Sequence, residues 1–107
     1  MTNNTTNAFG LTNRDMKTLL DTFAKYPEIK EVHLFGSRAK GNYKTGSDID
    51  LAAMNEGVNT KIISVINSLL SESSLPYKVY FVNFFELTNQ DFIDHIKRVG
   101  VPFYKRQ

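Results

Sequence analysis

The chain has 107 residues, no cysteine and a net charge of +2, with 41% hydrophobic and 22% charged residues. This length provides one core, and the lack of cysteine excludes disulfides, zinc–thiolate sites and thiol nucleophiles. No apolar run is long enough to cross a bilayer and the composition suits a reducing compartment, so we expect a cytoplasmic protein without a membrane partner. The small net charge does not indicate a nucleic-acid partner, and a small ligand or a protein fits it better.

The first predicted elements are a tail and a helix. Residues 1–11 are mostly polar and show no periodicity, so we expect a disordered tail ahead of one domain at residues 12–107. Thr12 or Asn13 is a suitable N-cap for a helix that runs to about Tyr26 and stops before a proline. The apolar stripe of this helix comprises Met16, Leu19, Leu20 and Phe23.

Two predicted strands follow, with a polar segment between them. Residues 31–35 predict a strand that runs straight into Gly36-Ser37. The segment 38–47 is polar and contains two glycines, which indicates mostly loop or one short helical turn. Residues 48–53 alternate between acidic and apolar side chains and predict the second strand. The short, glycine-containing link favours an antiparallel pairing of the two strands.

The second half of the chain continues the alternation of helices and strands. We expect a helix at about 59–71, a strand at 77–84, a helix at 88–99 and a short closing strand at 101–104. The expected core side of the first of these helices comprises Ile62, Ile63, Val65, Ile66, Leu69 and Leu70, and that of the last helix comprises Phe92, Ile93, Ile96 and Val99. The pattern predicts an α/β fold with a small mixed β-sheet packed with helices.

Two aspartates on the second strand form a candidate metal site. Asp48 and Asp50 lie two residues apart, so they point to the same face of the strand. The opposite face is apolar and must be buried, which fixes the register. Two like charges about 7 Å apart repel each other unless a cation lies between them, and Mg²⁺ prefers such oxygen ligands. On its own, this pattern also fits an edge strand with a solvated polar face.

The bend before these aspartates is a candidate phosphate site. Gly36 lets the backbone approach a phosphate closely, Ser37 donates from its hydroxyl and N–H groups, and Arg38 can fork onto phosphate oxygens. A glycine–serine turn and a surface arginine are the ordinary alternatives. Next to a dicarboxylate site, however, the bend indicates phosphoryl or nucleotidyl transfer.

The two motifs together resemble a known family. Gly36-Ser37, ten intervening residues and Asp48-Ile49-Asp50 form the pattern G-S-x10-D-x-D, which is similar to the signature of the polymerase-beta-like nucleotidyltransferase superfamily. The stretch FGSRAKGNYKTGSDIDLA resembles the small stand-alone members, the minimal nucleotidyltransferases (MNT). The resemblance covers roughly residues 12–106 and implies the nucleotidyltransferase fold, which is like the palm of polymerase beta.

The resemblance also implies roles for the site residues. Gly36 and Ser37 grip the triphosphate with help from Arg38, while Asp48 and Asp50 ligate two Mg²⁺ ions and act as the catalytic residues. The implied reaction moves a nucleoside monophosphate from an NTP, above all ATP, to a hydroxyl group and releases pyrophosphate. Minimal members commonly pair with a HEPN-domain protein as antitoxin and toxin and can transfer AMP to a tyrosine of the toxin, which implies such a partner here.

One position departs from the family pattern. Active members read Tyr-Lys-Val-Asp on the third strand, whereas residues 77–80 read Tyr-Lys-Val-Tyr. The missing acid completes the coordination of one metal and accepts a proton, so its loss predicts a weak second Mg²⁺ site and slow transfer. We expect Tyr80 to be a packing aromatic, with a regulatory or modified tyrosine as the alternative. Glu56 and Glu86 lie beyond strand ends and would need loop excursions to substitute.

Three interpretations of function remain open. Asp48 and Asp50 favour a metal-dependent enzyme, and Tyr80 favours an inactive module that binds a HEPN-type partner. A transferase for small molecules, like the aminoglycoside nucleotidyltransferases, is the third. Those enzymes usually carry an added helical domain, so a partner chain or a second copy in a homo-oligomer would have to supply that surface here. We expect His33 to be structural and His95 to lie on the polar side of the last helix.

Overall fold

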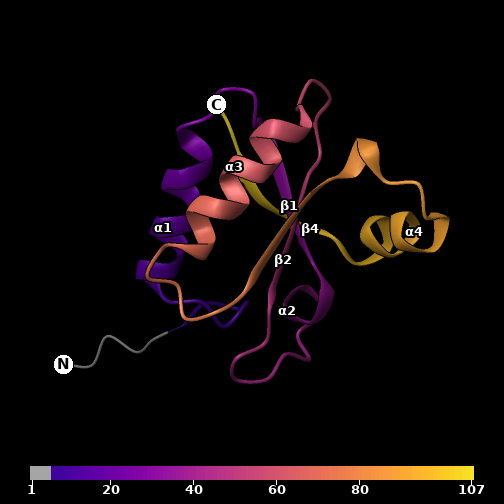
Figure 1. Cartoon of the computed structure of the whole chain (residues 1–107). Coiled ribbons are helices and arrows are strands. Elements are labelled where there is room, and N and C mark those ends of the chain that lie inside the picture. The colour runs from indigo at the N-terminus through magenta and orange to yellow at the C-terminus, as the bar shows by residue number, and fades with distance from the viewer. Residues whose placement is uncertain (1–5) are drawn as a thin grey trace.

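The computed structural model describes residues 6–107 and contains the predicted helices and strands in the predicted order (Figure 1). The elements are α1 (Asn13–Ala24), β1 (Glu31–Phe35), α2 (Gly36–Lys40), β2 (Ile49–Ala53), α3 (Thr60–Ser71), β3 (Val79–Asn83), the 3-10 turn η1 (Phe84–Glu86), α4 (Gln90–Val99) and β4 (Val101–Lys105). Within this range, no helix combines the length and the apolar character that crossing a bilayer requires.

The four strands form one mixed sheet in the order β3-β2-β1-β4. β1 runs antiparallel to both β2 and β4, whereas β2 runs parallel to β3. The predicted mixed sheet and its antiparallel first pair are therefore confirmed. Helices α1 and α3 cover one face of the sheet and α4 lies on the other (Figure 1).

The face under α1 and α3 carries the larger core. Thr12 caps α1 through a reciprocal pair of bonds with Asp15, which settles the choice between the two expected caps. Alternation along β2 directs Ile49 and Leu51 into this core, where both are fully buried. The remaining fully buried members include Leu19, Phe23, Ile29, Val32, Leu34 and Ile66.

The opposite face has a smaller core beneath α4. Phe35, Ala52 and Ile96 form its buried part, and Phe92 and Val99 pack against it. The ring of Phe92 meets that of Phe35 edge-on at a centroid distance of 5.5 Å. Asp50 lies two residues before Ala52 on β2, so the candidate acids belong to this less covered face.

The outer edge of β3 is closed by a side chain of α3. Asn67 accepts a hydrogen bond from the Phe81 N–H at 3.1 Å and donates one to the Phe81 carbonyl at 2.8 Å. These are the two backbone groups that a further strand would pair with at this position. The side-chain amide therefore takes the place of a neighbouring strand.

Part of the predicted core side of α3 is wrong. Val65 and Leu69 are 36% and 37% exposed, whereas Ile66 and Leu70 are buried. A helix that packs on a sheet buries one stripe, and residues next to that stripe are rotated about 100° away from its centre. The apolar residues of α3 extend around more of the helix surface than the part that packs on the sheet.

Part of the segment expected as a disordered tail is packed against the domain. Leu11 is 1% exposed and belongs to the main core, and the ring of Phe9 lies 6.1 Å from that of Phe103. The side chain of Asn7 accepts hydrogen bonds from both Phe9 and Leu11, which folds this segment back on itself. Residues 6–11 therefore pack on the domain, while the first five residues of the expected tail lie outside the described range.

Candidate functional site

Asp48 and Asp50 lie at the start of β2. Asp48 is exposed immediately before the strand, and Asp50 is its second residue and half-buried. The intervening Ile49 and the following Leu51 are fully buried in the main core. The buried residues hold the strand in register, so alternation directs both carboxylates to the α4 face of the sheet.

The bend after β1 lies directly against Asp50. Phe35 pairs with Asp50 across the two strands, and the next residue, Gly36, has a φ of +75°. A Cβ at Gly36 would overlap the Oδ2 atom of Asp50 and would lie 3.2 Å from its Cγ. Both the backbone conformation and the space therefore require glycine. Ser37 follows as the half-buried second residue of α2.

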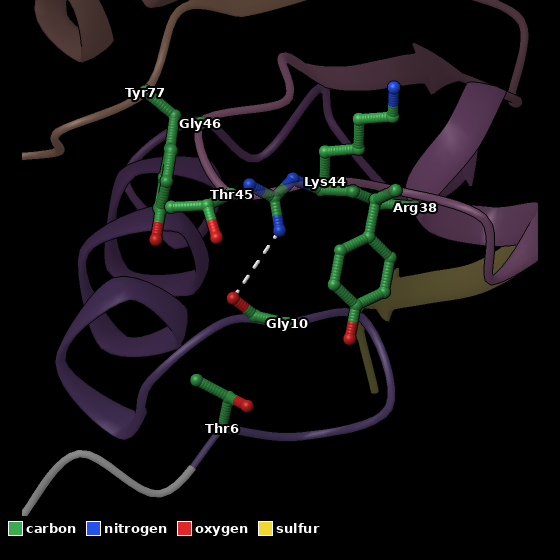
Figure 2. Close-up of a pocket in the computed structure, with 8 residues that line it drawn as sticks. Thr6, Gly10, Arg38, Lys44, Thr45, Gly46 and Tyr77 are labelled. Atoms are coloured by element: carbon green, nitrogen blue, oxygen red, sulfur yellow. Dashed lines mark hydrogen bonds between the residues drawn. The ribbon is translucent and has the colours of Figure 1, made fainter.

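Arg38 has a different environment from the phosphate contact expected of it. Its side chain is only 2% exposed, and its guanidinium donates to backbone carbonyls (Figure 2). Nε and Nη2 both donate to Ser47 O, at 3.2 and 2.8 Å. Nη1 donates to Phe9 O at 2.8 Å and to Gly10 O at 3.3 Å. The guanidinium thus joins protein segments to each other instead of facing the open side of the site.

Charge and burial make Asp50 an unusual carboxylate. Its pKa is raised above the ordinary 3.8, first because burial disfavours the charged form and second because the Asp48 charge is close, while His95 acts in the opposite direction. A divalent cation between the acids would relieve both unfavourable effects. Carboxylate oxygens are the donors that a hard cation prefers, so these two residues fit such an ion.

His95 is the residue near the site that the sequence did not predict. It was expected on the polar side of the last helix, yet it is half-buried and its ring meets the ring of Phe35 edge-on at 6.1 Å. α4 packs over the end of β1, and this brings the histidine within electrostatic range of Asp50. The periodicity of α4 alone contains no signal for that proximity.

Tyr80 lies beside Asp50, at the position where the resemblance led us to expect a third acid. The two residues are register partners on the parallel strands β2 and β3, so their side chains share a face. Tyr80 is 47% exposed, and the prediction of a packing aromatic is therefore wrong. The strands β1 and β2 contribute the buried residues Phe35 and Ala52 to the core beneath α4. Tyr80 of β3 does not belong to this core.

Neither glutamate near the strand ends replaces the missing acid. Glu86 follows β3 and binds Thr60 Oγ1 at 2.8 Å and Asn83 Nδ2 at 3.3 Å. Glu56 follows β2 and is exposed. Because β2 and β3 run parallel, both glutamates lie at the end of the sheet opposite Asp48. Across residues 6–107, no three His, Asp or Glu side chains gather as a metal site.

A cavity of about 270 Å³ lies beside the site but does not include the acids. It surrounds the guanidinium of Arg38, as Figure 2 shows. Its lining comprises Thr6, Gly10, Arg38, Tyr43, Lys44, Thr45, Gly46 and Tyr77. Of the two aspartates, Asp48 is exposed and Asp50 is half-buried, and neither lines this cavity.

Sequence comparison connects this geometry to a family. The model of the family "Polymerase beta, Nucleotidyltransferase" matches residues 17–107. A probable protein adenylyltransferase MntA of Haemophilus influenzae is 34% identical over 77 residues, which cover 71% of this chain and 67% of that protein.

Solved structures share the fold. A crystal structure of a toxin–antitoxin with AMP-PNP has a TM-score of 0.69 at 19% identity. The match covers 87% of this chain and 75% of the matched chain. A structure of a tri-AMPylated Shewanella oneidensis HEPN toxin in complex with MNT antitoxin has a TM-score of 0.57 at 20% identity. This match covers 88% of this chain and 69% of the matched chain. These likenesses confirm the predicted nucleotidyltransferase fold. Together with the family match and the Haemophilus relative, they show that this chain belongs to the polymerase beta nucleotidyltransferase family, among its minimal, MntA-like members.

Proposed function

We propose that this chain transfers a nucleoside monophosphate from a Mg²⁺-bound nucleoside triphosphate, above all ATP, to a hydroxyl group of a partner protein. The observation that carries the proposal is the close approach of Gly36 to the carboxylate of Asp50. In such a reaction the phosphate-binding bend and the metal-binding acids must act on one shared ligand. Here they lie against each other.

Each site residue has a distinct task in this proposal. Asp48 and Asp50 hold the cation through their carboxylate oxygens, and Gly36 lets the backbone approach the triphosphate. Ser37 donates hydrogen bonds from its hydroxyl and N–H groups to phosphate oxygens. When bound, the cation neutralises phosphate charge and lowers the pKa of the attacking hydroxyl. These residues therefore act mainly by positioning and by charge.

The replacement of the third acid limits the expected rate. Tyr80 stands beside Asp50 with a half-exposed phenol, which lacks the carboxylate oxygens that Mg²⁺ prefers as ligands. The pair of aspartates holds one cation better than two. We therefore expect nucleotide binding with one firmly held Mg²⁺, and slow transfer.

The acceptor in this proposal is a HEPN-domain toxin, with this chain as its antitoxin. The Haemophilus relative is named a probable protein adenylyltransferase, and one structural neighbour is an MNT antitoxin with a tri-AMPylated HEPN toxin. The exposed side chains of Asp48 and Tyr80 support an acceptor that arrives on another chain. An exposed hydroxyl of the partner would reach the α-phosphate from this side.

Labelled ATP provides the test of this proposal. We expect the purified protein with Mg²⁺ and its HEPN partner to label the partner slowly, Tyr80→Asp to label it at least about tenfold faster, and Asp50→Asn to leave it unlabelled. Glu56→Gln is the control because it removes an exposed acid at the opposite end of the sheet. If the wild-type protein fails to bind ATP in the presence of Mg²⁺, the enzymatic proposal is wrong.

The inactive binding module is the second candidate, because Tyr80 stands beside Asp50 where the resemblance predicts a third acid, and within residues 6–107 no third His, Asp or Glu gathers with the two aspartates. In that case the partner complex forms equally well with wild type and with Asp50→Asn, and neither protein labels the partner. Labelling by the wild type as fast as by Tyr80→Asp would contradict the module and would also show that the third acid is dispensable.

A further inference from the structure

The environment of Arg38 points to a task beyond its own hydrogen bonds. Arg38 follows Ser37 of the phosphate-binding bend, and two of its donors, Nε and Nη2, meet the carbonyl of Ser47, the residue before Asp48. The side chain of Arg38 thus connects the first and last residues of the ten-residue link 38–47. This link joins the phosphate-binding bend to the metal-binding acids. Arginine suits this task because its planar fork presents several donors in a fixed geometry.

The same guanidinium also holds the N-terminal segment. Nη1 donates to the carbonyls of Phe9 and Gly10, and the segment is fixed further by the bridge between Thr6 and Thr12 and by the buried Leu11. Gly10 has a φ of +76°, and a Cβ there would lie 2.5 Å from the Tyr43 ring and 2.9 Å from Nη1. The close approach of this segment to Arg38 therefore requires glycine.

Two aromatic rings complete the enclosure. The guanidinium carbon of Arg38 lies 4.4 Å from the ring centroid of Tyr77 and 5.3 Å from that of Tyr43. Tyr77 leads into β3, the strand that carries Tyr80, and Tyr43 belongs to the link between β1 and β2. Cation–π contacts to buried guanidinium groups stabilise such arrangements and restrict their motion. Figure 2 shows Arg38 at the centre of this group.

We propose that Arg38 is a positioning residue, a clasp that sets the separation between the phosphate-binding bend and the metal-binding acids and fastens residues 6–12 over the link between them. The clasp rests on the proposed function, because its consequence is a correctly spaced nucleotide site. It replaces the direct phosphate contact expected of Arg38. Its hydrogen bonds go to three carbonyls from two segments, an arrangement that a lysine ammonium cannot reproduce.

The chain contains a matched control for this proposal. Arg106 also donates to three backbone carbonyls, those of Ala24, Tyr26 and Ile29, at the opposite end of β1. Arg38→Ala and Arg106→Ala therefore remove the same kind of interaction at different distances from the site. Both variants are expected to unfold at lower temperature than wild type. Only Arg38→Ala is expected to weaken binding of Mg²⁺–AMP-PNP, by about tenfold or more in calorimetry.

Amide hydrogen exchange of the metal-free protein tests the clasp in the absence of nucleotide. Arg38→Ala should accelerate exchange at residues 7–11 and 41–48, whereas Arg106→Ala should accelerate it near residues 24–30. If Arg38→Ala leaves exchange at 41–48 unchanged, or binds Mg²⁺–AMP-PNP as tightly as wild type, the clasp is overturned. Failure of the wild type to bind AMP-PNP would count against the proposed function, and the exchange result would still decide the clasp.

Two further measurements separate positioning from simple stability. Arg38→Lys keeps the charge and most of the side-chain volume, so it should fold even where the alanine variant does not, yet it should show the same loss of nucleotide affinity. Millimolar guanidinium ion can enter the space left between the two rings in Arg38→Ala and should restore part of the binding. Full affinity in Arg38→Lys, or equal loss of affinity in Arg106→Ala, would contradict the proposal.

Discussion

The two faces of the sheet divide stability from chemistry, and β2 contributes to both. On the face beneath α1 and α3, Ile49 and Leu51 are fully buried in a continuous apolar core. On the other face Asp50 stands beside an exposed Tyr80 and above a core with only three buried members. A strand with one fully buried face can hold two repelling acids at fixed spacing on the other, because burial of the apolar side chains determines the register.

The largest expected effect lies on the core face. Leu51→Ala removes a fully buried side chain next to Asp50 and should lower the free energy of unfolding by about 2–5 kcal/mol, because the lost burial leaves a cavity. Urea denaturation measures the change. At temperatures where the variant is folded, its AMP-PNP affinity should stay close to that of wild type. A large loss of affinity in folded Leu51→Ala would break the proposed separation of the two faces.

Gly36→Ala tests the site face with a smaller effect on stability. The substitution strains a positive φ and inserts a methyl group against Asp50, so we expect a cost of about 1–3 kcal/mol together with loss of nucleotide binding. Gly46→Ala is the control, because Gly46 has a φ of +86° but open space around its missing Cβ. Calorimetry should therefore show weak binding for Gly36→Ala alone, and equal binding by both variants would contradict the contact.

In the metal-free protein, Asp50→Asn should increase the stability of the fold, whereas the two preceding substitutions decrease it. The pKa of Asp50 is raised by burial and by Asp48, so the folded state holds this proton more tightly than the unfolded chain does. The ionised carboxylate therefore destabilises the fold above its raised pKa, and this penalty fades as the pH falls toward 3.8. At neutral pH we expect Asp50→Asn to raise Tm, as measured by thermal unfolding. The difference should shrink in acid, and a lower Tm at neutral pH would show that the carboxylate makes a stabilising contact.

The smallest expected effect concerns the outer side of α3. Leu69→Ala should cost about 1 kcal/mol or less because the side chain is more than a third exposed, whereas Leu70→Ala should cost about 2–5 kcal/mol. Thermal unfolding of the two neighbouring variants compares them directly. Similar losses would mean that the core extends farther around α3 than the burial of its side chains indicates.

Local patterns predicted most of the fold. The alternation at residues 48–53 placed Asp48 and Asp50 on one side of a strand, and the glycine-containing link predicted the antiparallel pairing of β1 with β2. The order of helices and strands likewise predicted a mixed sheet with helices packed on it. These features depend on residues that are close in the sequence, where a period or a turn residue carries the information.

Features that depend on distant segments were not predictable in this way. Arg38 resembled a phosphate ligand because only its neighbours were visible, and nothing local shows that the carbonyls of Gly10 and Ser47 converge on it. His95 comes close to Asp50 only because α4 packs over the end of β1. The exposure of Tyr80 depends in the same way on which strands that helix covers, and the periodicity of a single helix does not determine that.

The pairing of Asn67 with Phe81 bears on how this domain can assemble with others. With the N–H and the carbonyl of Phe81 already engaged, a neighbouring molecule cannot prolong the sheet by laying an extra strand along β3 at that point. At this edge, association is thereby left to side-chain surfaces such as the exposed Tyr80. One amide group thus guards one of the two borders of the sheet against growth by strand addition.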